Sequence, residues 1–184
     1  MLAVAGNEQL PVRQARQGDP QAWDALFRRY QLPLYSYVYE LVSNEQLSLD
    51  IVQESFINAT RHIRSLREDA RFGSWLFGIA RQKVAAHWRK PDRTTSLGDD
   101  WPDAGTDEAD NPRNWLIHRE QEEQFMTLLQ ELPQVQRDVL MLHFLEEFSL
   151  REISDITGAP VGTVKSRMHH AKQSLRKLLQ EGMT

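Results

Sequence analysis

The chain has 184 residues, of which 40% are hydrophobic and 26% are charged, and this balance is typical of one ordinary or two small globular domains. It has no cysteine, which excludes disulfides, thiolate zinc sites and a thiol redox switch of its own. Residues 1–10 lack the features of a signal peptide and no run of about 18 apolar residues follows, so we expect a cytoplasmic protein. The formal net charge of −4 argues against a free-standing nucleic-acid binder, because such proteins usually carry a basic excess.

The charge is distributed unevenly along the chain. Residues 61–90 hold eight basic side chains against two acidic ones, a local net charge of +6. Residues 92–113 hold seven acidic side chains against two basic ones, a net charge of −5. From Val161 onward five basic side chains outnumber Glu181. The pattern is two basic patches separated by an acidic spacer, which the overall charge conceals.

The N-terminal part is predicted to be helical, because apolar residues recur at steps of three and four and no stretch alternates like a strand. Asp19 suits the N-cap position of a helix and Pro20 its first turn, while Pro33 is expected to start or kink the next helix. The first three predicted helices run over about 8–17, 20–31 and 33–43.

Two further helices complete the predicted N-terminal domain. One buries a stripe at steps of four and three, and the other, over about 71–90, buries an apolar face and ends in basic residues. The expected buried stripe is Val52, Phe56, Ala59, Ile63 and Leu66, opposite Asp50, Gln53, Glu54 and Asn58. The second helix is expected to bury Phe72, Trp75, Leu76, Ile79 and Val84 and to expose Arg81, Lys83 and His87. The side chain of Trp88 could be either core or a stacking platform for a base.

Residues 91–114 are predicted to be a linker, because after Pro91 two further prolines and two glycines interrupt an acidic segment without an apolar period. The predicted domains are therefore 1–90 and 115–184, with 91–114 between them.

The C-terminal part is also predicted to be helical, with helices over about 115–131 and 133–145. Ser149 and Glu152 form a capping box ahead of a short helix, and Gly158 supplies its C-terminal stop. A longer helix begins two or three residues later.

This last helix has two distinct faces. Its apolar stripe consists of Val161, Val164, Met168, Ala171, Leu175 and Leu178, and its basic face of Lys165, His169, Lys172 and Arg176. Two helices joined by a tight turn, the second with a basic face, are typical of a helix-turn-helix that enters the DNA major groove. The pattern alone also permits an ordinary helical hairpin with a solvated basic face.

Several segments resemble the extracytoplasmic-function (ECF) sigma factors of the sigma-70 family. The run from Ser149 to Arg167, with Leu132 to Leu140 before it, is similar to the fourth conserved region of that family. Residues 50–56, DIVQESF, resemble the second region, and 72–81, FGSWLFGIAR, resemble the helix that follows it. The likeness covers about 20–90 and 116–179 in the expected order. It implies an all-α fold with region 2 and region 4 domains on either side of a flexible acidic linker.

The resemblance implies a function: binding core RNA polymerase and directing it to promoters, under the control of an anti-sigma factor that could hold the chain at the inner membrane. The residues expected to bind polymerase are Asp50, Gln53, Glu54 and Ile57. The minus-10 element is expected to bind as a separated strand, with one base extruded into a protein pocket. The residues expected to bind it are Arg64, Ser65, Arg67, Glu68, Arg81, Gln82, Lys83, His87 and Arg89. Those expected to face the minus-35 element are Thr163, Lys165, Ser166, Arg167, His169, His170 and Lys172.

The minus-10 helix departs from the family pattern. Where many members have Arg-Asn followed by an acidic or amide residue, this chain has Arg81-Gln82 and later Ala86-His87. The preferred minus-10 bases are therefore not predicted.

Catalytic and metal chemistry are not expected. The six histidines have no carboxylate or cysteine partners at ligand spacing, and His169 and His170 project about 100° apart on a helix. Since no nucleophile triad, phosphate-binding loop or carboxylate pair is found, we expect no cofactor and no enzyme activity.

Two other functions are weighed against a sigma factor. A conventional dimeric helix-turn-helix regulator explains the C-terminal half but gives the basic helix ending near Lys90 no role. A protein-interaction module without DNA contact fits the net charge but not the basic face of Lys165 and Lys172. Only a sigma factor should need core polymerase before it selects DNA.

Overall fold

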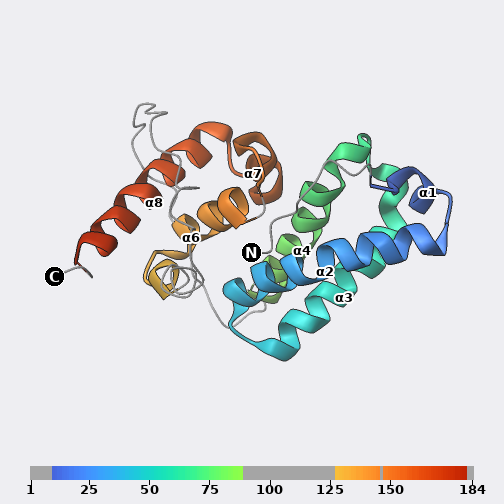
Figure 1. The fold of residues 1–184 in the computed structure, drawn as a ribbon, viewed down its shortest axis with the longest axis horizontal. Coiled ribbons are helices and arrows are strands. Elements are labelled where there is room, and N and C mark those ends of the chain that lie inside the picture. The colour runs from blue at the N-terminus through green and yellow to red at the C-terminus, as the bar shows by residue number, and fades with distance from the viewer. Residues whose placement is uncertain (1–9, 89–126, 146, 182–184) are drawn as a thin grey trace. The chain divides into compact units, whose positions relative to one another are not determined.

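The computed structural model describes residues 10–88, 127–145 and 147–181, and every regular element in these ranges is a helix, as predicted (Figure 1). The predicted linker 91–114, Arg89 and most of the helix expected over 115–131 lie outside the described residues. By their contacts the residues form two compact units, Met1–Leu97 with Asp155–Gly158, and Gly98–Ser154 with Ala159–Thr184. No helix within the described ranges is both long and apolar enough to cross a bilayer.

The N-terminal unit begins with a short helix, α1 (Val12–Arg16), followed by the long helix α2 (Pro20–Val42). The carboxylate of Asp19 accepts a hydrogen bond of 2.9 Å from the backbone N–H of Gln21, so Asp19 is the predicted N-cap. The prediction that a new helix starts at Pro33 is wrong, because α2 continues through this residue.

Burial explains why the helix tolerates this proline. A proline inside a helix removes one backbone hydrogen bond and costs about 3 kcal/mol. Pro33 itself is buried, and Tyr30, Leu34 and Tyr37 around it are at least 95% buried. Burying side chains of this size stabilises the fold by about 1.5–3 kcal/mol each, which offsets the lost hydrogen bond.

Helix α3 (Glu45–His62) lies against α2 and carries the predicted buried stripe. The side chain of Asn44 caps it by accepting a 2.9 Å hydrogen bond from the N–H of Leu47. All five residues of the stripe are buried, although its last two lie beyond the helix. Ile63 lies in the 3-10 turn η1 (Ile63–Ser65), and Leu66 follows it as an anchor for the connection to α4.

Helix α4 (Phe72–Trp88) closes the N-terminal core after a second 3-10 turn, η2 (Asp69–Arg71). It contacts both α2 and α3. The rings of Tyr30 and Phe72 lie 5.5 Å apart and those of Tyr37 and Phe77 lie 5.3 Å apart, joining α2 to α4 through the core. Leu76, Phe77 and Ala80 have no exposed surface. The helices α2, α3 and α4 thus form one bundle, in which α3 and α4 lie side by side.

The C-terminal helices are α6 (Gln134–Leu140), α7 (Leu150–Thr157) and α8 (Val161–Glu181). The single helix predicted over 133–145 is α-helical only to Leu140 and continues as a π-helical turn, η4 (Met141–Leu145). Leu140, Leu142, Ile153 and Leu175 are almost fully buried and form a shared core.

The apolar stripe of α8 is confirmed at its four central members, Val164, Met168, Ala171 and Leu175, which are all buried. Val161 is 38% exposed and Leu178 is half-buried. The prediction is therefore wrong for Val161, which belongs to the first turn of α8, beyond the reach of the core.

Candidate nucleic-acid interface

The predicted polymerase-binding residues share the exposed side of α3. Asp50, Gln53 and Glu54 are exposed, and Ile57 is 41% exposed. Leu49, at 48% exposure, stands four residues before Gln53, and Ile57 stands four residues after it, so these three side chains form one mixed row on the exposed side of α3. The amide of Gln46 donates a 3.0 Å hydrogen bond to Asp50 Oδ1. Exposed apolar side chains rimmed by polar ones are typical of a protein-binding surface.

Aromatic side chains of α2 extend this surface. Phe27 is 41% exposed and packs edge-on against Phe56 at 4.9 Å. Tyr35 and Tyr39 stack at 5.9 Å. Partial desolvation, with smaller effects from Glu45 and Tyr39, raises the pKa of the Tyr35 phenol, so this side chain remains a neutral hydrogen-bonding group.

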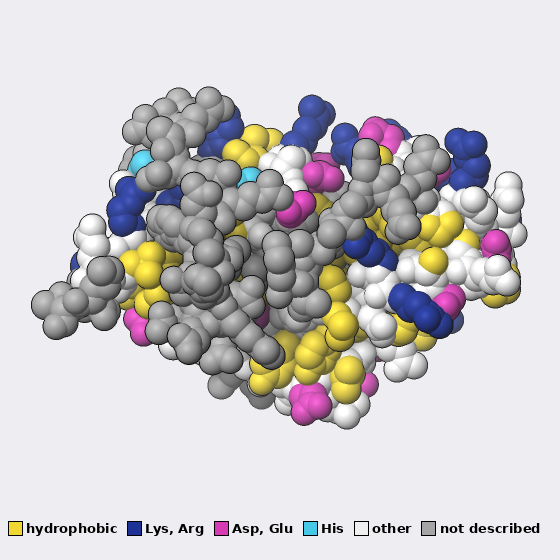
Figure 2. All heavy atoms as spheres, in the orientation of Figure 1, with side chains coloured by type: hydrophobic (Ala, Val, Ile, Leu, Met, Phe, Trp, Pro, Cys, Tyr) yellow, Lys and Arg dark blue, Asp and Glu magenta, His cyan; other side chains and the backbone are white. Residues whose placement is uncertain are grey.

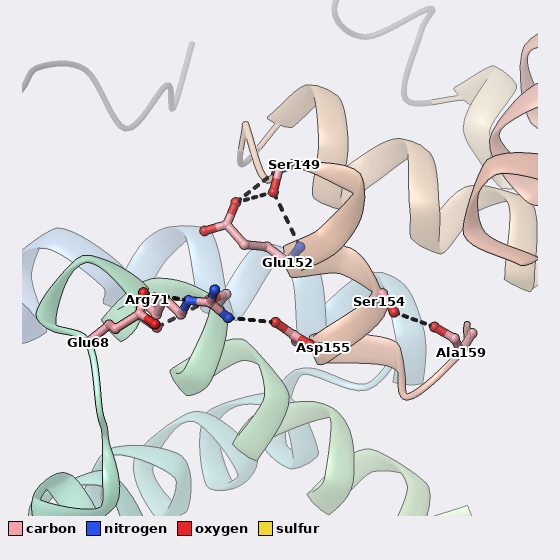
Figure 3. A network of polar contacts seen from close by, with 8 residues as sticks. Glu68, Arg71, Ser149, Glu152, Ser154, Asp155 and Ala159 are labelled. Atoms are coloured by element: carbon pink, nitrogen blue, oxygen red, sulfur yellow. Dashed lines mark hydrogen bonds and ion pairs between the residues drawn. The ribbon is translucent and has the colours of Figure 1, made fainter. Parts of the chain in front are cut away.

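The connection between α3 and α4 holds the predicted base pocket. Arg64, Ser65, Arg67 and Glu68 are all exposed, and they lie around the buried anchors Ile63 and Leu66. The hydroxyl of Ser65 donates a 2.8 Å hydrogen bond to the carbonyl of His62. The carboxylate of Glu68 forms an ion pair of 3.0 Å with Arg71 Nε (Figure 3), so it is already paired with a cation in this structure.

An arginine far away in the sequence fixes this connection. Arg16 Nη2 of α1 donates to the carbonyl of Leu66 at 2.9 Å and to Asp69 Oδ1 at 2.8 Å. A guanidinium that bridges a carbonyl and a carboxylate restrains both ends of the segment between them. Sequence reasoning did not find Arg16, because no periodic signal links residues that are 50 positions apart.

The predicted minus-10 side chains of α4 fall into two groups. Gln82 and His87 are exposed, whereas Arg81 and Lys83 are half-buried and paired with other helices. Arg81 Nη1 donates to the hydroxyl of Tyr37 at 3.1 Å, and Lys83 Nζ lies 2.8 Å from Glu54 Oε2. These contacts hold the two cations against the bundle in the free protein.

Of the two tryptophans in the predicted minus-10 helix, the structure describes the side chain of one. Trp75, predicted as core, is half-buried, with its ring 6.0 Å from that of Phe72. The side chain of Trp88 lies outside the described part of the chain.

The turn between α7 and α8 is built from the predicted signals. Glu152 Oε2 accepts hydrogen bonds from the N–H of Ser149 at 2.9 Å and from its hydroxyl at 2.7 Å (Figure 3). The N–H of Glu152 donates back to Ser149 Oγ at 3.3 Å, completing the capping box. Gly158 has φ +71°, the left-handed conformation that ends α7, and Ser154 donates to the carbonyl of Ala159 at 2.6 Å.

The predicted minus-35 residues of α8 differ in how far they are exposed. Lys165 is exposed, and Thr163, Arg167, His169, His170 and Lys172 are half-buried. Ser166 is 6% exposed and its hydroxyl donates to the carbonyl of Thr163 at 3.0 Å, so its side chain lies outside the accessible face. The ammonium of Lys172 lies 5.9 Å above the ring of Phe144. No group of side chains suited to hold a metal ion occurs in the described residues.

Comparison with known proteins agrees with this division. A family model described as sigma-70 region 2 matches residues 26–94, and one described as sigma-70, region 4 matches residues 122–175. An ECF RNA polymerase sigma-E factor of Haemophilus influenzae is 33% identical over 97% of this chain and 98% of its own. The ECF RNA polymerase sigma factor SigW of Bacillus subtilis is 31% identical over 92% of this chain and 95% of its own.

Two solved structures share the fold. One is CnrH in complex with the cytosolic domain of CnrY, with a TM-score of 0.64 and 21% identity over 95% of this chain and 97% of that one. The other is the sigma factor RpoE of Bartonella quintana in complex with the anti-sigma factor NepR, with a TM-score of 0.58 and 23% identity over 84% and 96%. Together with the sequence relatives, the matched regions show that this chain belongs to the extracytoplasmic-function sigma factors of the sigma-70 family.

Proposed function

We propose that the protein is an alternative sigma factor that binds core RNA polymerase and directs it to promoters with minus-10 and minus-35 elements. It acts in the cytoplasm as an initiation factor without catalytic activity of its own. The observation that supports the proposal is the presence, in one chain, of two helical units that each carry basic side chains on an accessible surface. One has an exposed basic connection between α3 and α4, and the other has a helix-turn-helix.

The domains of the proposal are residues 1–90 for region 2, 91–114 for the linker and 115–184 for region 4. In region 2 the exposed face of α3, with Asp50, Gln53, Glu54 and Ile57, binds polymerase. Its mixture of carboxylates, amide and apolar side chains suits a protein partner better than a phosphate backbone.

The minus-10 element is bound as a separated strand. Unstacking one base costs a few kcal/mol, so the protein must supply a fitted pocket and cationic contacts. The exposed connection with Arg64 and Arg67 supplies the pocket, and Gln82 and His87 on α4 extend the path. Arg81 and Lys83 contact the strand once phosphate groups replace Tyr37 and Glu54 as their partners.

The minus-35 element is bound as duplex. α8 is a regular helix whose first turns carry Thr163, Lys165 and Arg167, and a recognition helix places this part in the major groove. Lys172 and Arg176 continue along the helix at spacings that suit phosphate contacts. Ser166 supports the turn of the backbone instead of reading bases.

An anti-sigma factor is a further proposed partner. Two solved structures that share this fold are complexes, one of them with a named anti-sigma factor. The exposed apolar side chains of α2 and α3, among them Phe27, Leu32 and Leu49, offer a surface for which such a partner could compete with polymerase. A membrane-bound anti-sigma factor would hold the chain at the inner membrane.

The test is transcription in vitro with bacterial core polymerase on a pool of promoter fragments, followed by mapping of start sites. We expect new starts that share two upstream elements. A variant with Lys165→Ala, Arg167→Ala and Lys172→Ala should lose them, whereas Arg28→Ala, which breaks only the exposed Arg28–Asp24 pair of α2, should keep them. The proposal fails if the wild-type chain gives no new starts.

A further inference from the structure

Ser154 forms a hydrogen bond across the turn of the helix-turn-helix. Helix α7 ends at Thr157 and α8 begins at Val161. The hydroxyl of Ser154, in the last turn of α7, donates a 2.6 Å hydrogen bond to the carbonyl of Ala159, which lies between the two helices (Figure 3). Both residues belong to the C-terminal unit. The hydrogen bond therefore links the end of one helix to the segment that leads into the next.

The direction of this hydrogen bond distinguishes Ser154 from two serines of the N-terminal unit. A serine hydroxyl inside a helix commonly donates backward, to the carbonyl three or four residues before it. Ser48 and Ser55 of α3 do this, with hydrogen bonds of 2.6 Å to the carbonyls of Asn44 and Ile51. A backward bond restrains only the helix that contains it. The bond from Ser154 runs forward by five residues, so it restrains the turn.

The backbone of the turn has considerable conformational freedom. Gly158 has φ +71°, and in the described part of the chain no atom beyond its neighbours lies within 4 Å of the place where a Cβ would stand. Pro160 is exposed, and its carbonyl accepts a 3.0 Å hydrogen bond from the N–H of Val164 at the start of α8. Glycine moves readily between backbone conformations when no side chain packs around it. The Ser154 hydroxyl therefore supplies a restraint that packing at Gly158 does not.

The start of α8 is the part of the helix-turn-helix whose orientation matters for reading bases. Its first turns carry Thr163, Lys165 and Arg167. Hydrogen bonds to base edges need distances of about 2.7–3.2 Å and nearly linear angles, so a small rotation of the helix breaks them. In a helix-turn-helix the first helix crosses the DNA backbone while the second enters the major groove. The geometry of the turn therefore decides where these side chains meet the bases.

Phosphate contacts depend much less on the geometry of the turn. Lys172 and Arg176 follow later on α8, and in Figure 2 dark-blue Lys and Arg side chains stand on the surface where Figure 1 draws this helix. Long cationic side chains have many rotamers and can follow a displaced phosphate. Such contacts give affinity for any DNA sequence but carry no base information. A loosened turn should thus weaken discrimination between sequences more than general affinity for DNA.

We infer that Ser154 is a positioning residue for minus-35 recognition. Its hydroxyl orients the start of α8 through the turn, and it sharpens discrimination between minus-35 sequences without contacting DNA. The side chain is half-buried and its hydroxyl proton is bound to the carbonyl of Ala159, so this donor is not offered to a base. The inference rests on the proposed function, in which the helix-turn-helix binds the minus-35 element as duplex.

The test uses the full chain assembled with core polymerase. A promoter fragment located by start-site mapping is compared with the same fragment after its minus-35 element has been scrambled, and the ratio of the two affinities measures discrimination. Ser154→Ala should lower this ratio by about 2- to 10-fold, the factor that corresponds to one hydrogen bond. Affinity for the scrambled fragment and its dependence on salt should stay as in the wild type, because the variant keeps every charge.

Ser154→Thr and Ser154→Val are the matched variants. The two introduced side chains have nearly the same shape, but only threonine keeps a hydroxyl. We expect Ser154→Thr to retain the wild-type ratio and Ser154→Val to lower it as Ser154→Ala does. Thermal unfolding separates positioning from stability: Ser154→Ala loses a hydrogen bond but gains helix propensity, so its melting temperature should shift by less than about 4 °C.

Two results would overturn the inference. Equal ratios in Ser154→Thr and Ser154→Val would mean that the hydroxyl has no part in discrimination. A fall of both affinities by the same factor in Ser154→Ala would mean that Ser154 only stabilises the fold. Failure of the proposed function looks different, because wild-type protein with polymerase would then give no new starts or would not distinguish the two fragments. If the wild type distinguishes them and Ser154→Ala does so equally well, only the role of Ser154 is wrong.

Discussion

The ammonium of Lys83 on α4 lies 2.8 Å from the carboxylate of Glu54 on α3. The pair joins a side chain proposed to bind DNA to one proposed to bind polymerase. An ion pair with one partner largely exposed is worth about 0–1 kcal/mol, so either partner macromolecule can break it at little cost. Polymerase that engages Glu54 would release Lys83 for the minus-10 strand.

Glu54→Gln tests this coupling. Without the carboxylate, Lys83 is free to contact phosphate, so the free protein should bind a single-stranded minus-10 oligonucleotide several-fold more tightly, by about 1 kcal/mol at most. Binding to core polymerase should weaken in the same variant. Fluorescence anisotropy with labelled DNA and with labelled protein measures the two affinities.

The control for that experiment is Asp24→Asn, which removes another exposed ion pair of 2.8 Å, the one with Arg28 on α2. It should change neither affinity. If Glu54→Gln leaves DNA binding unchanged, the pair does not restrain Lys83.

Arg16→Ala should loosen the connection between α3 and α4. The variant loses the ion pair to Asp69 and the hydrogen bond to Leu66, which together are worth about 1–2 kcal/mol. Amide hydrogen exchange of residues 63–71 should accelerate by about 5- to 30-fold, because local opening becomes that much less costly. Arg13→Ala, on the exposed side of α1, should leave the exchange rates as they are.

The two side chains of the capping box, Ser149 and Glu152, should contribute to the stability of α7 as a coupled pair. Ser149→Ala or Glu152→Ala should each destabilise α7 by about 1 kcal/mol, because either change breaks the reciprocal hydrogen bonds. The double variant should cost less than the sum of the two. Thermal unfolding measures the costs, and Arg151→Ala in the same turn serves as the control. Strict additivity would mean that the two side chains act independently.

Replacing each of the two glycines beside the turn by alanine should change the stability of the fold in opposite directions. Gly158 has φ +71°, where a Cβ costs about 1–2 kcal/mol, so Gly158→Ala should lower the unfolding temperature and impair minus-35 binding. Gly162 lies within α8, in open space, so Gly162→Ala should stabilise the helix by up to about 1 kcal/mol. Destabilisation by both changes would contradict this account of the turn.

Local signals in the sequence predicted much of the fold. The α3 stripe, the Asp19 cap, the capping box and the glycine stop all depend on residues within one or two helical turns of each other. The continuity of α2 through Pro33 could not be predicted, since it depends on core partners contributed by α4. The π-helical turn at Met141 gave no recognisable pattern either.

The candidate site was predictable to a similar degree. Helical spacing gave the exposed face of α3, but of the residues predicted to face the minus-35 element on α8 only Lys165 is exposed. Spacing could not exclude Ser166, whose backbone hydrogen bond is a local detail. The links from Arg16 to Asp69 and from Lys83 to Glu54 join distant segments and required the structure.

The central claim is that the chain selects promoter DNA only as part of a polymerase complex. The most direct measurement is the binding of labelled promoter duplex to the protein alone, to core polymerase alone, and to both together, each against excess unrelated DNA. The account predicts a sequence-selective complex only when both are present, and its loss with Lys165→Ala and Lys172→Ala. Tight selective binding by the protein alone, unaltered by polymerase, would contradict it and favour a conventional dimeric regulator.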